Sequence, residues 1–140
     1  MKTCYIYART ATIAQQEVIN GHNNKINEQV RACQDYAKKH SYEILGVFTD
    51  IGSEDTLKRA GLQRLLIYCK KHPSTAVIIL RVGRISRNLA DYSKLHLQLK
   101  EKDIQLISVI EGDLSGSTGN LLGGILVAKA QFESERSKYK

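Results

Sequence analysis

The chain has 140 residues, 42% hydrophobic and 25% charged, a composition that excludes a disordered tail or a coiled-coil rod and predicts one domain over residues 1–140. Twenty-one Lys and Arg against fourteen Asp and Glu give a charge of +7, which favours a nucleic acid partner but also fits an ordinary basic protein. The three cysteines form no CxxC pair, so neither a zinc site nor a disulfide framework is supported. We expect a cytoplasmic protein with no metal, no cofactor and no membrane segment.

The first half of the chain alternates between strand and helix patterns. An apolar run over residues 4–8 predicts a buried strand, and apolar residues at helical spacing predict an amphipathic helix over 25–40. A second strand is expected over 42–49. A polar loop over 50–60 then leads into a helix over 61–72.

The second half continues the alternation. Residues 76–80 form a short, continuous apolar run that is typical of a central parallel strand covered on both faces. Residues 88–91 resemble a capping box that opens a helix running to about Lys102. A strand over 104–110 and a polar loop over 111–118 follow.

The end of the chain, from about residue 120 to the C-terminus, predicts one long helix. An apolar stripe at steps of four, three and four residues runs along it: Leu121, Ile125, Ala128 and Phe132. The stripe could pack in the core, but its length beyond the sheet favours a contact with a second copy. Gly123 and Gly124 interrupt it and could permit a close approach or a bend.

The alternation as a whole predicts an α/β fold, with a mostly parallel sheet of four to five strands flanked by helices. Cys33 and Cys69 occupy apolar positions of predicted helices, so we expect them in the core. The four histidines are scattered without metal-ligand spacing, so surface or helix-end positions are expected for them. Acidic residues such as Asp50 and Glu111 could form a metal-dependent nuclease site, but their loop positions and the nearby arginines argue against it.

Four arginines stand where a ligand site is expected. Arg9 lies at the carboxyl end of the first strand, where ligands bind in open α/β sheets. Arg84 and Arg87 follow the third strand, three residues apart, so both could point to one face. Arg59 ends the polar loop. Arginine forks bind phosphate oxygens through paired hydrogen bonds, so the set predicts a phosphate clamp, although each arginine alone could be a surface residue.

The pattern does not identify the molecule that carries the phosphate, which could be a nucleotide, a protein or DNA. No Gly-x-x-x-x-Gly-Lys and no Gly-x-Gly-x-x-Gly is present, which disfavours a nucleotide.

Several segments, taken in chain order, carry a family resemblance. They are Tyr7-Ala8-Arg9-Thr10-Ala11-Thr12 with Gln15, Gln29 with Cys33, Tyr36 and Ala37, Phe48-Thr49-Asp50-Ile51-Gly52, Arg59-Ala60-Gly61-Leu62, Arg84-Ile85-Ser86-Arg87, Glu111 with Gly119, and Ala130-Gln131-Phe132-Glu133. Together they resemble the N-terminal catalytic domain of the serine site-specific recombinases of the resolvase/invertase family. The resemblance covers nearly the whole chain. Residues 17–25 look like an insertion relative to small resolvases.

The resemblance implies a mechanism of DNA recombination. A serine hydroxyl attacks a DNA phosphodiester and forms a 5′-phosphoserine link without a metal, and arginines stabilise the phosphoryl oxygens. By position, Arg9, Arg59, Arg84 and Arg87 would bind the DNA phosphate, with Gln15 as a polar support. The C-terminal helix would hold a homodimer or tetramer together. Such a protein acts in the cytoplasm, at the nucleoid when bound to DNA, and often belongs to a mobile element.

Two departures from the family pattern bear on activity. Ala11 stands at the nucleophile position and has no hydroxyl, and Gly83 stands where the family has an aspartate. Thr10 and Thr12 carry hydroxyls, but a shift of one residue would re-aim the nucleophile, and attack geometry tolerates little displacement. We therefore expect no covalent catalysis by this chain. An engineered change could explain Ala11 alone, whereas Ala11 together with Gly83 favours natural decay or a regulatory homologue.

Three functions remain open from the sequence. The first is a recombinase catalytic domain, active in its native form or formerly active. The second is a non-catalytic homologue that binds DNA or pairs with an active recombinase. The third is an unrelated α/β domain that binds phosphate.

Overall fold

A computed structural model of the chain describes residues 2–10, 25–51, 60–85, 89–116, 123–129 and 132. The elements are β1 (Lys2–Thr10), α2 (Lys25–Lys39), β2 (Tyr42–Ile51), α3 (Ala60–Lys71), β3 (Ala76–Ile79), the 3-10 turn η1 (Val82–Arg84), α4 (Leu89–Glu101), β4 (Gln105–Ser108) and β5 (Gly112–Asp113). They form a five-stranded sheet in the order β2-β1-β3-β4-β5. All neighbours pair in parallel except β4 and β5, which are antiparallel.

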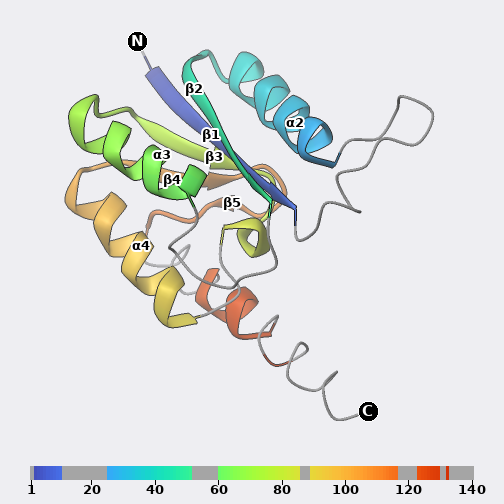
Figure 1. Cartoon of the computed structure of the whole chain (residues 1–140), viewed down its shortest axis with the longest axis vertical. Coiled ribbons are helices and arrows are strands. Elements are labelled where there is room, and N and C mark those ends of the chain that lie inside the picture. Colours follow the sequence, from blue (N-terminus) through green and yellow to red (C-terminus); the bar gives the residue numbers. More distant parts are fainter. Residues whose placement is uncertain are drawn as a thin grey trace.

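Helices cover both faces of this sheet, so the molecule has three layers. Figure 1 shows α2 on one side and α3 and α4 on the other. β1 lies between β2 and β3 and is buried from Cys4 onward, because its alternate side chains face the two helical layers. Cys4 and Ile6 pack against Cys33 and Ala37 of α2. The small side chains on both sides of this contact let the helix approach the sheet closely.

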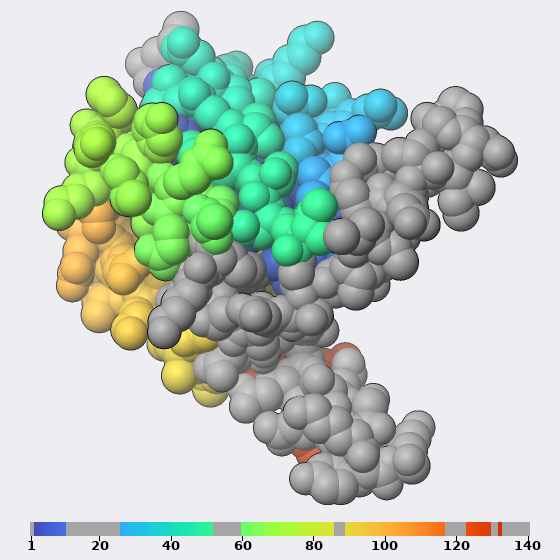
Figure 2. Space-filling model, in the orientation of Figure 1, coloured from blue at the N-terminus to red at the C-terminus, as the bar shows by residue number. Residues whose placement is uncertain are grey.

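The opposite face carries larger side chains. Tyr5 and Tyr7 of β1 pack with Leu62 and Leu65 of α3 and with Leu95 of α4. The rings of Tyr5 and Phe48 meet edge to face at 5.8 Å. β2 is the edge strand beside this core, and it is visible at the surface between α2 and α3 (Figure 2).

The predicted α/β fold is confirmed, with most elements within two or three residues of their expected bounds. β4 ends at Ser108, shorter than expected. The segment 111–118, predicted as a loop, contains the short strand β5. Gly112 has a φ of +94°, a conformation that suits glycine and turns the chain back so that Leu114 N–H donates to the Leu106 carbonyl. Both residues of this short strand are exposed, so the pattern of apolar side chains did not reveal it.

The histidine prediction is wrong at one position. His96 is only 7% exposed, and its Nε2 lies 2.8 Å from the Leu114 carbonyl oxygen, so α4 uses it to hold the chain after β5. His40 and His72 are exposed, as expected. Cys33 and Cys69 are buried and free, which confirms their place in the core.

Residues 123–129 are helical, consistent with the start of the predicted C-terminal helix. Val127 is buried in the core, whereas Ile125 and Phe132 are 57% and 62% exposed. The predicted apolar stripe therefore faces outward at these two positions instead of packing in the core, and Leu121 lies outside the described residues. Gly123 meets Tyr92, since a Cβ there would lie 2.0 Å from the phenol oxygen, so this glycine does provide a close approach.

Candidate functional site

The side chain of Arg9 occupies the carboxyl end of β1. It continues the alternation of Tyr5 and Tyr7 and is only 2% exposed, which is unusual for a charged side chain. Its Nε donates to the Arg84 carbonyl at 3.2 Å, and its Nη2 lies 3.4 Å from the Gly83 carbonyl. These contacts join the end of β1 to the segment that follows β3, 75 residues further along the chain.

The backbone of Arg9 is held from the opposite face by Gln29 of α2. Pairing between β1 and β3 ends at Ile6, so the peptide groups of Arg9 need another partner. The Gln29 amide supplies both halves: Oε1 accepts from Arg9 N–H at 3.2 Å, and Nε2 donates to the Arg9 carbonyl at 2.8 Å. Since Gln29 is only 3% exposed, both bonds are shielded from water and fix the backbone of Arg9.

Arg84 belongs to η1, a single turn directly after β3. Arg84 N–H donates to the Arg81 carbonyl and Ile85 N–H to the Val82 carbonyl, both at 3.0 Å. Ile85 is fully buried, which anchors the turn, whereas Arg84 is half-buried. The turn brings two main-chain carbonyls to the Arg9 guanidinium, and it places Arg84 beside Arg9 at the same edge of the sheet.

Asp50 fixes the third segment at this edge. It ends up inside β2 and not in a loop as predicted, and its carboxylate caps α3 by accepting from Gly61 N–H at 2.7 Å and Leu62 N–H at 2.9 Å. Tyr7 Oη donates to the same carboxylate at 2.7 Å. Gly61 has to be a glycine, because a Cβ there would lie 2.2 Å from the Thr49 carbonyl oxygen.

The structure thus brings two of the predicted site residues, Arg9 and Arg84, into one place. Ala11, Gln15, Arg59 and Arg87 lie outside the described residues. Asp50 holds the start of α3, immediately after Arg59 in the chain, at the same edge of the sheet. At Gly83 an added Cβ would meet nothing within 4 Å, so a Cβ fits there.

Sequence reasoning missed the residues that hold the site in place. Gln29 was noticed only as part of the family's helix pattern, and Asp50 and Glu111 were considered as metal ligands. In the structure Gln29 binds the Arg9 backbone, Asp50 caps α3, and Glu111 Oε1 accepts from Val82 N–H at 2.6 Å. Polar residues next to strand ends are the signal that could have identified Asp50 as a cap.

The three cysteine thiols are buried and are poor nucleophiles. Burial raises the pKa of Cys33 to about 12 and the pKa of Cys4 and Cys69 each to about 11, so all three stay protonated at neutral pH. Within the described ranges no group of three His, Cys, Asp or Glu side chains is placed to hold a metal ion. No helix in the described part of the chain is long and apolar enough to cross a membrane.

Two cavities lie elsewhere in the molecule. One of about 180 Å³ is lined by α4, β4 and Ser115, and one of about 530 Å³ lies between β2 and α3. Neither is lined by Arg9 or Arg84. The fold is therefore a three-layer α/β domain. Its site arginines, Arg9 and Arg84, lie at the carboxyl ends of parallel strands and do not line either cavity.

Comparison with known proteins gives that class a family. Residues 4–140 match the family described as the N-terminal domain of resolvase. Transposon Tn552 DNA-invertase BinR of Staphylococcus aureus is 28% identical over 130 residues, which are 91% of this chain and 59% of that protein. Transposon Tn552 resolvase of the same species is 31% identical over 97 residues, 67% of this chain and 48% of that protein. The chain thus spans about half the length of these relatives.

Solved structures agree with this match. The N-terminal catalytic domain of TP901-1 integrase superposes with a TM-score of 0.72 at 28% identity, over 96% of this chain and 98% of that one. A resolvase family site-specific recombinase from Streptococcus pneumoniae shares the fold, with a TM-score of 0.69 at 24% identity over 99% and 92% of the two chains. The chain belongs to the resolvase family of serine recombinases and has the fold of their catalytic domain.

Proposed function

We propose that this chain is a recombinase catalytic domain that binds a DNA phosphate between Arg9, Arg59, Arg84 and Arg87, with Gln15 as a polar support, and that lacks the nucleophile at Ala11. The observation that carries the proposal is the buried Arg9 guanidinium, tied to the carbonyls of Gly83 and Arg84. A charged side chain that served only solubility would stay exposed, because removing a guanidinium from water costs free energy. A fixed guanidinium is instead suited to stabilising charge on a phosphoryl group.

The missing hydroxyl explains why this chain binds DNA without cutting it. Cleavage in the proposed reaction joins the serine oxygen to the phosphorus as the hydroxyl gives up its proton. The bond between the phosphorus and the 3′ oxygen breaks, and the departing 3′ oxygen takes up a proton to become a free 3′-hydroxyl. An alanine methyl group at residue 11 cannot form that bond. Non-covalent binding to the phosphate backbone needs only the arginines.

Restoring the hydroxyl tests the proposal. The chain would be fused after Lys140 to a DNA-binding module of known sequence and mixed with duplexes that carry two module sites around a randomised centre. We expect no covalent adduct with the parent chain, an adduct with Ala11→Ser, and more adduct with Ala11→Ser/Gly83→Asp, which restores the family's aspartate at a position where a Cβ meets nothing within 4 Å. The adduct would be detected by denaturing electrophoresis. Folded proteins of both variants that form no adduct on any duplex would refute the proposal.

A specific observation favours a second candidate, a homologue that assembles with an active recombinase. Ile125 and Phe132 present apolar surface on the C-terminal segment, and such surface is suited to pairing with another copy in a dimer or tetramer. Adding parent chain to the Ala11→Ser protein would then reduce its adduct by forming mixed assemblies. Adding the parent chain with Ile125→Glu would not, and equal behaviour of the two additions would remove this candidate.

A further inference from the structure

The turn between β4 and β5 reaches back to the segment after β3. Glu111 Oε1 accepts from Val82 N–H at 2.6 Å and lies 2.8 Å from Ser108 Oγ, whose hydroxyl can donate to it. Ser108 Oγ in turn accepts from Glu111 N–H at 3.1 Å and lies 3.0 Å from the Leu80 carbonyl. The Glu111 carboxylate therefore holds Val82 at the start of η1, and the Ser108 hydroxyl, with its single proton, can donate either to Glu111 or to the Leu80 carbonyl.

The contact matters because η1 has no cap of its own. Arg81 stands at the cap position in extended conformation and makes no side-chain hydrogen bond there. Val82 is only 3% exposed, so its N–H has little access to water and would be costly to leave unpaired. The Glu111 carboxylate acts as a cap from 29 residues away, and its charge makes the hydrogen bond stronger than a neutral one.

The same turn holds the arginine site. Its next two residues, Gly83 and Arg84, present their carbonyls to the Arg9 guanidinium. Glu111 is thus connected to Arg9 by a hydrogen bond to Val82, by the covalent η1 backbone, and by the hydrogen bonds from Arg9 to the Gly83 and Arg84 carbonyls. Displacing Val82 would shift Arg84 directly and Arg9 through these carbonyls.

We propose that Glu111 is a positioning residue, which sets Arg9 and Arg84 relative to each other without touching DNA itself. This inference rests on the proposed function, since it assigns Glu111 to the same phosphate site. Charge stabilisation by fixed groups depends on their placement before the reaction, and displacements of about 1 Å can be costly. In a protein with the hydroxyl restored at residue 11, Glu111 therefore affects the rate of cleavage more than the affinity for DNA.

Asp113 provides a matched control in the same hairpin. Its carboxylate accepts from Ser115 N–H at 2.9 Å and lies 3.5 Å from Gln105 Nε2, and it is exposed. Asp113→Asn removes a carboxylate charge two residues from Glu111, from a side chain that contacts Ser115 and Gln105. Any general effect of charge or hairpin stability should appear equally in this variant.

The first experiment uses the chain as it stands and needs no cleavage. NMR would measure solvent exchange of the Val82 amide and of the Arg9 Nε–H, with the Ile78 amide in β3 as a reference for global opening. We expect Glu111→Ala to speed the first two on the order of tenfold and leave Ile78 unchanged. Glu111→Gln keeps an acceptor oxygen and should give a smaller change, and Asp113→Asn none.

The second experiment uses the fused Ala11→Ser protein. Adding Glu111→Ala should slow adduct formation on the order of tenfold at saturating DNA with an unchanged Kd. Glu111→Gln should recover part of the rate, and Asp113→Asn should match the Ala11→Ser parent. If Glu111→Ala fails to fold, the Glu111→Gln comparison carries the test.

The two experiments separate two kinds of failure. If Ala11→Ser forms no adduct, the proposed function fails, and Arg9 Nε–H exchange alone decides whether Glu111 positions that side chain. If Arg9 exchange in the Glu111 variants equals that in Asp113→Asn, the positioning role is overturned. An equal cleavage rate with and without Glu111→Ala overturns it as well.

Discussion

The two ends of the sheet are held together in different ways. At the carboxyl end, polar side chains bind main-chain groups: Gln29 holds Arg9, Asp50 holds Gly61 and Leu62, and Glu111 holds Val82. At the amino end the main chain mostly binds itself, as in Thr75 N–H to the Thr3 carbonyl at 3.0 Å and Gln105 N–H to the Thr75 carbonyl at 2.9 Å.

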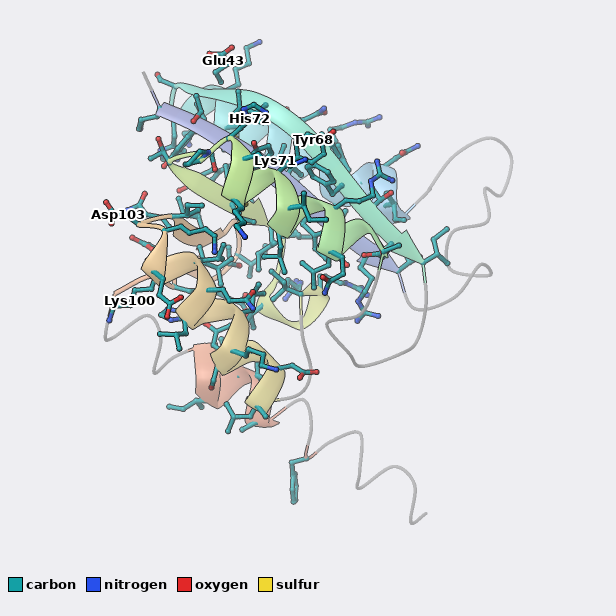
Figure 3. All side chains as sticks on the ribbon, turned by 60° about the vertical axis from the view of Figure 1, so that its left-hand side comes forward. Glu43, Tyr68, Lys71, His72, Lys100 and Asp103 are labelled. Atoms are coloured by element: carbon teal, nitrogen blue, oxygen red, sulfur yellow. The ribbon has the colours of Figure 1, made fainter. Side chains whose placement is uncertain are left out.

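Charges are distributed differently at the two ends as well. The helices end at the amino side of the sheet, and their last turns carry exposed lysines: Lys38, Lys39, Lys70, Lys71 and Lys100. Figure 3 shows Lys71, His72 and Glu43 in this region. Lysines at helix C-termini stabilise the helix dipole, so they need no ligand to explain them. The buried Arg9 is held instead by the Gly83 and Arg84 carbonyls, so the positive charges at the two ends of the sheet have different structural settings.

The largest expected loss of stability is at Gly61, where the start of α3 packs closely against the β2 backbone. A Cβ would lie 2.2 Å from the Thr49 carbonyl oxygen and 2.9 Å from Asp50 Oδ2. We expect Gly61→Ala to lower the free energy of unfolding by about 3 kcal/mol or more, measured by urea denaturation. Gly83→Ala is the control, because its Cβ meets nothing within 4 Å, and it should cause no comparable loss. Equal stability of Gly61→Ala and the parent would contradict the close approach.

The next effect is expected at Gln29. Gln29→Leu leaves the N–H and the carbonyl of Arg9 without their partner in a buried setting. Each such group costs about 1–3 kcal/mol, so the free energy of unfolding should fall by at least about 2 kcal/mol. Gln34→Leu, at an exposed position of the same helix, should change it little. Similar losses in both variants would mean that the helix, and not the Arg9 contact, is affected.

A smaller effect is expected at the amino end. Tyr5 Oη donates to the His72 carbonyl at 2.7 Å in a partly buried position. Tyr5→Phe keeps the ring and its contact with Phe48, and water can reach the exposed His72. Denaturation should therefore show a loss of about 1 kcal/mol, less than that of Gln29→Leu. A larger loss than at Gln29 would reverse the proposed difference between the two ends.

The elements of the fold could be predicted because each leaves a local signal. The run at 76–80 has the apolar pattern of a central strand, and the structure confirms β3 as the middle strand of the sheet. β5 could not be predicted, because two exposed residues leave no pattern. The outward direction of Ile125 and Phe132 was also not fixed, since an apolar stripe fits a core or an interface equally well.

The site was predictable only in part, for a physical reason. The rule that ligand sites lie at the carboxyl ends of parallel strands indicated Arg9 and Arg84, and the structure does place them together. Their roles toward DNA stay a prediction. The contacts of Gln29 and Glu111 span 20 and 29 residues, and no local spacing reveals a pairing between side chain and backbone over such separations.

The smallest stability effect, and the clearest separation of the two kinds of charge, is expected from Lys70 and Lys71. Lys70→Gln/Lys71→Gln should lower the free energy of unfolding by only about 0.3 kcal/mol per lysine, because both side chains are exposed and their interaction with the helix dipole is screened by water and salt. The twelve residues of α3 span about 18 Å from the arginine edge, whereas charges are screened over about 8 Å at physiological salt.

The effect on DNA binding should therefore be negligible for the lysine variant and clear for a variant at the arginine edge. In the fused protein, the salt dependence of DNA affinity, measured by fluorescence anisotropy, should keep its slope after Lys70→Gln/Lys71→Gln. Arg84→Gln removes a proposed phosphate contact and should reduce that slope by about one. Equal reductions in the two proteins would mean that DNA is held by net charge alone, and the arginine edge would then have no special part in binding it.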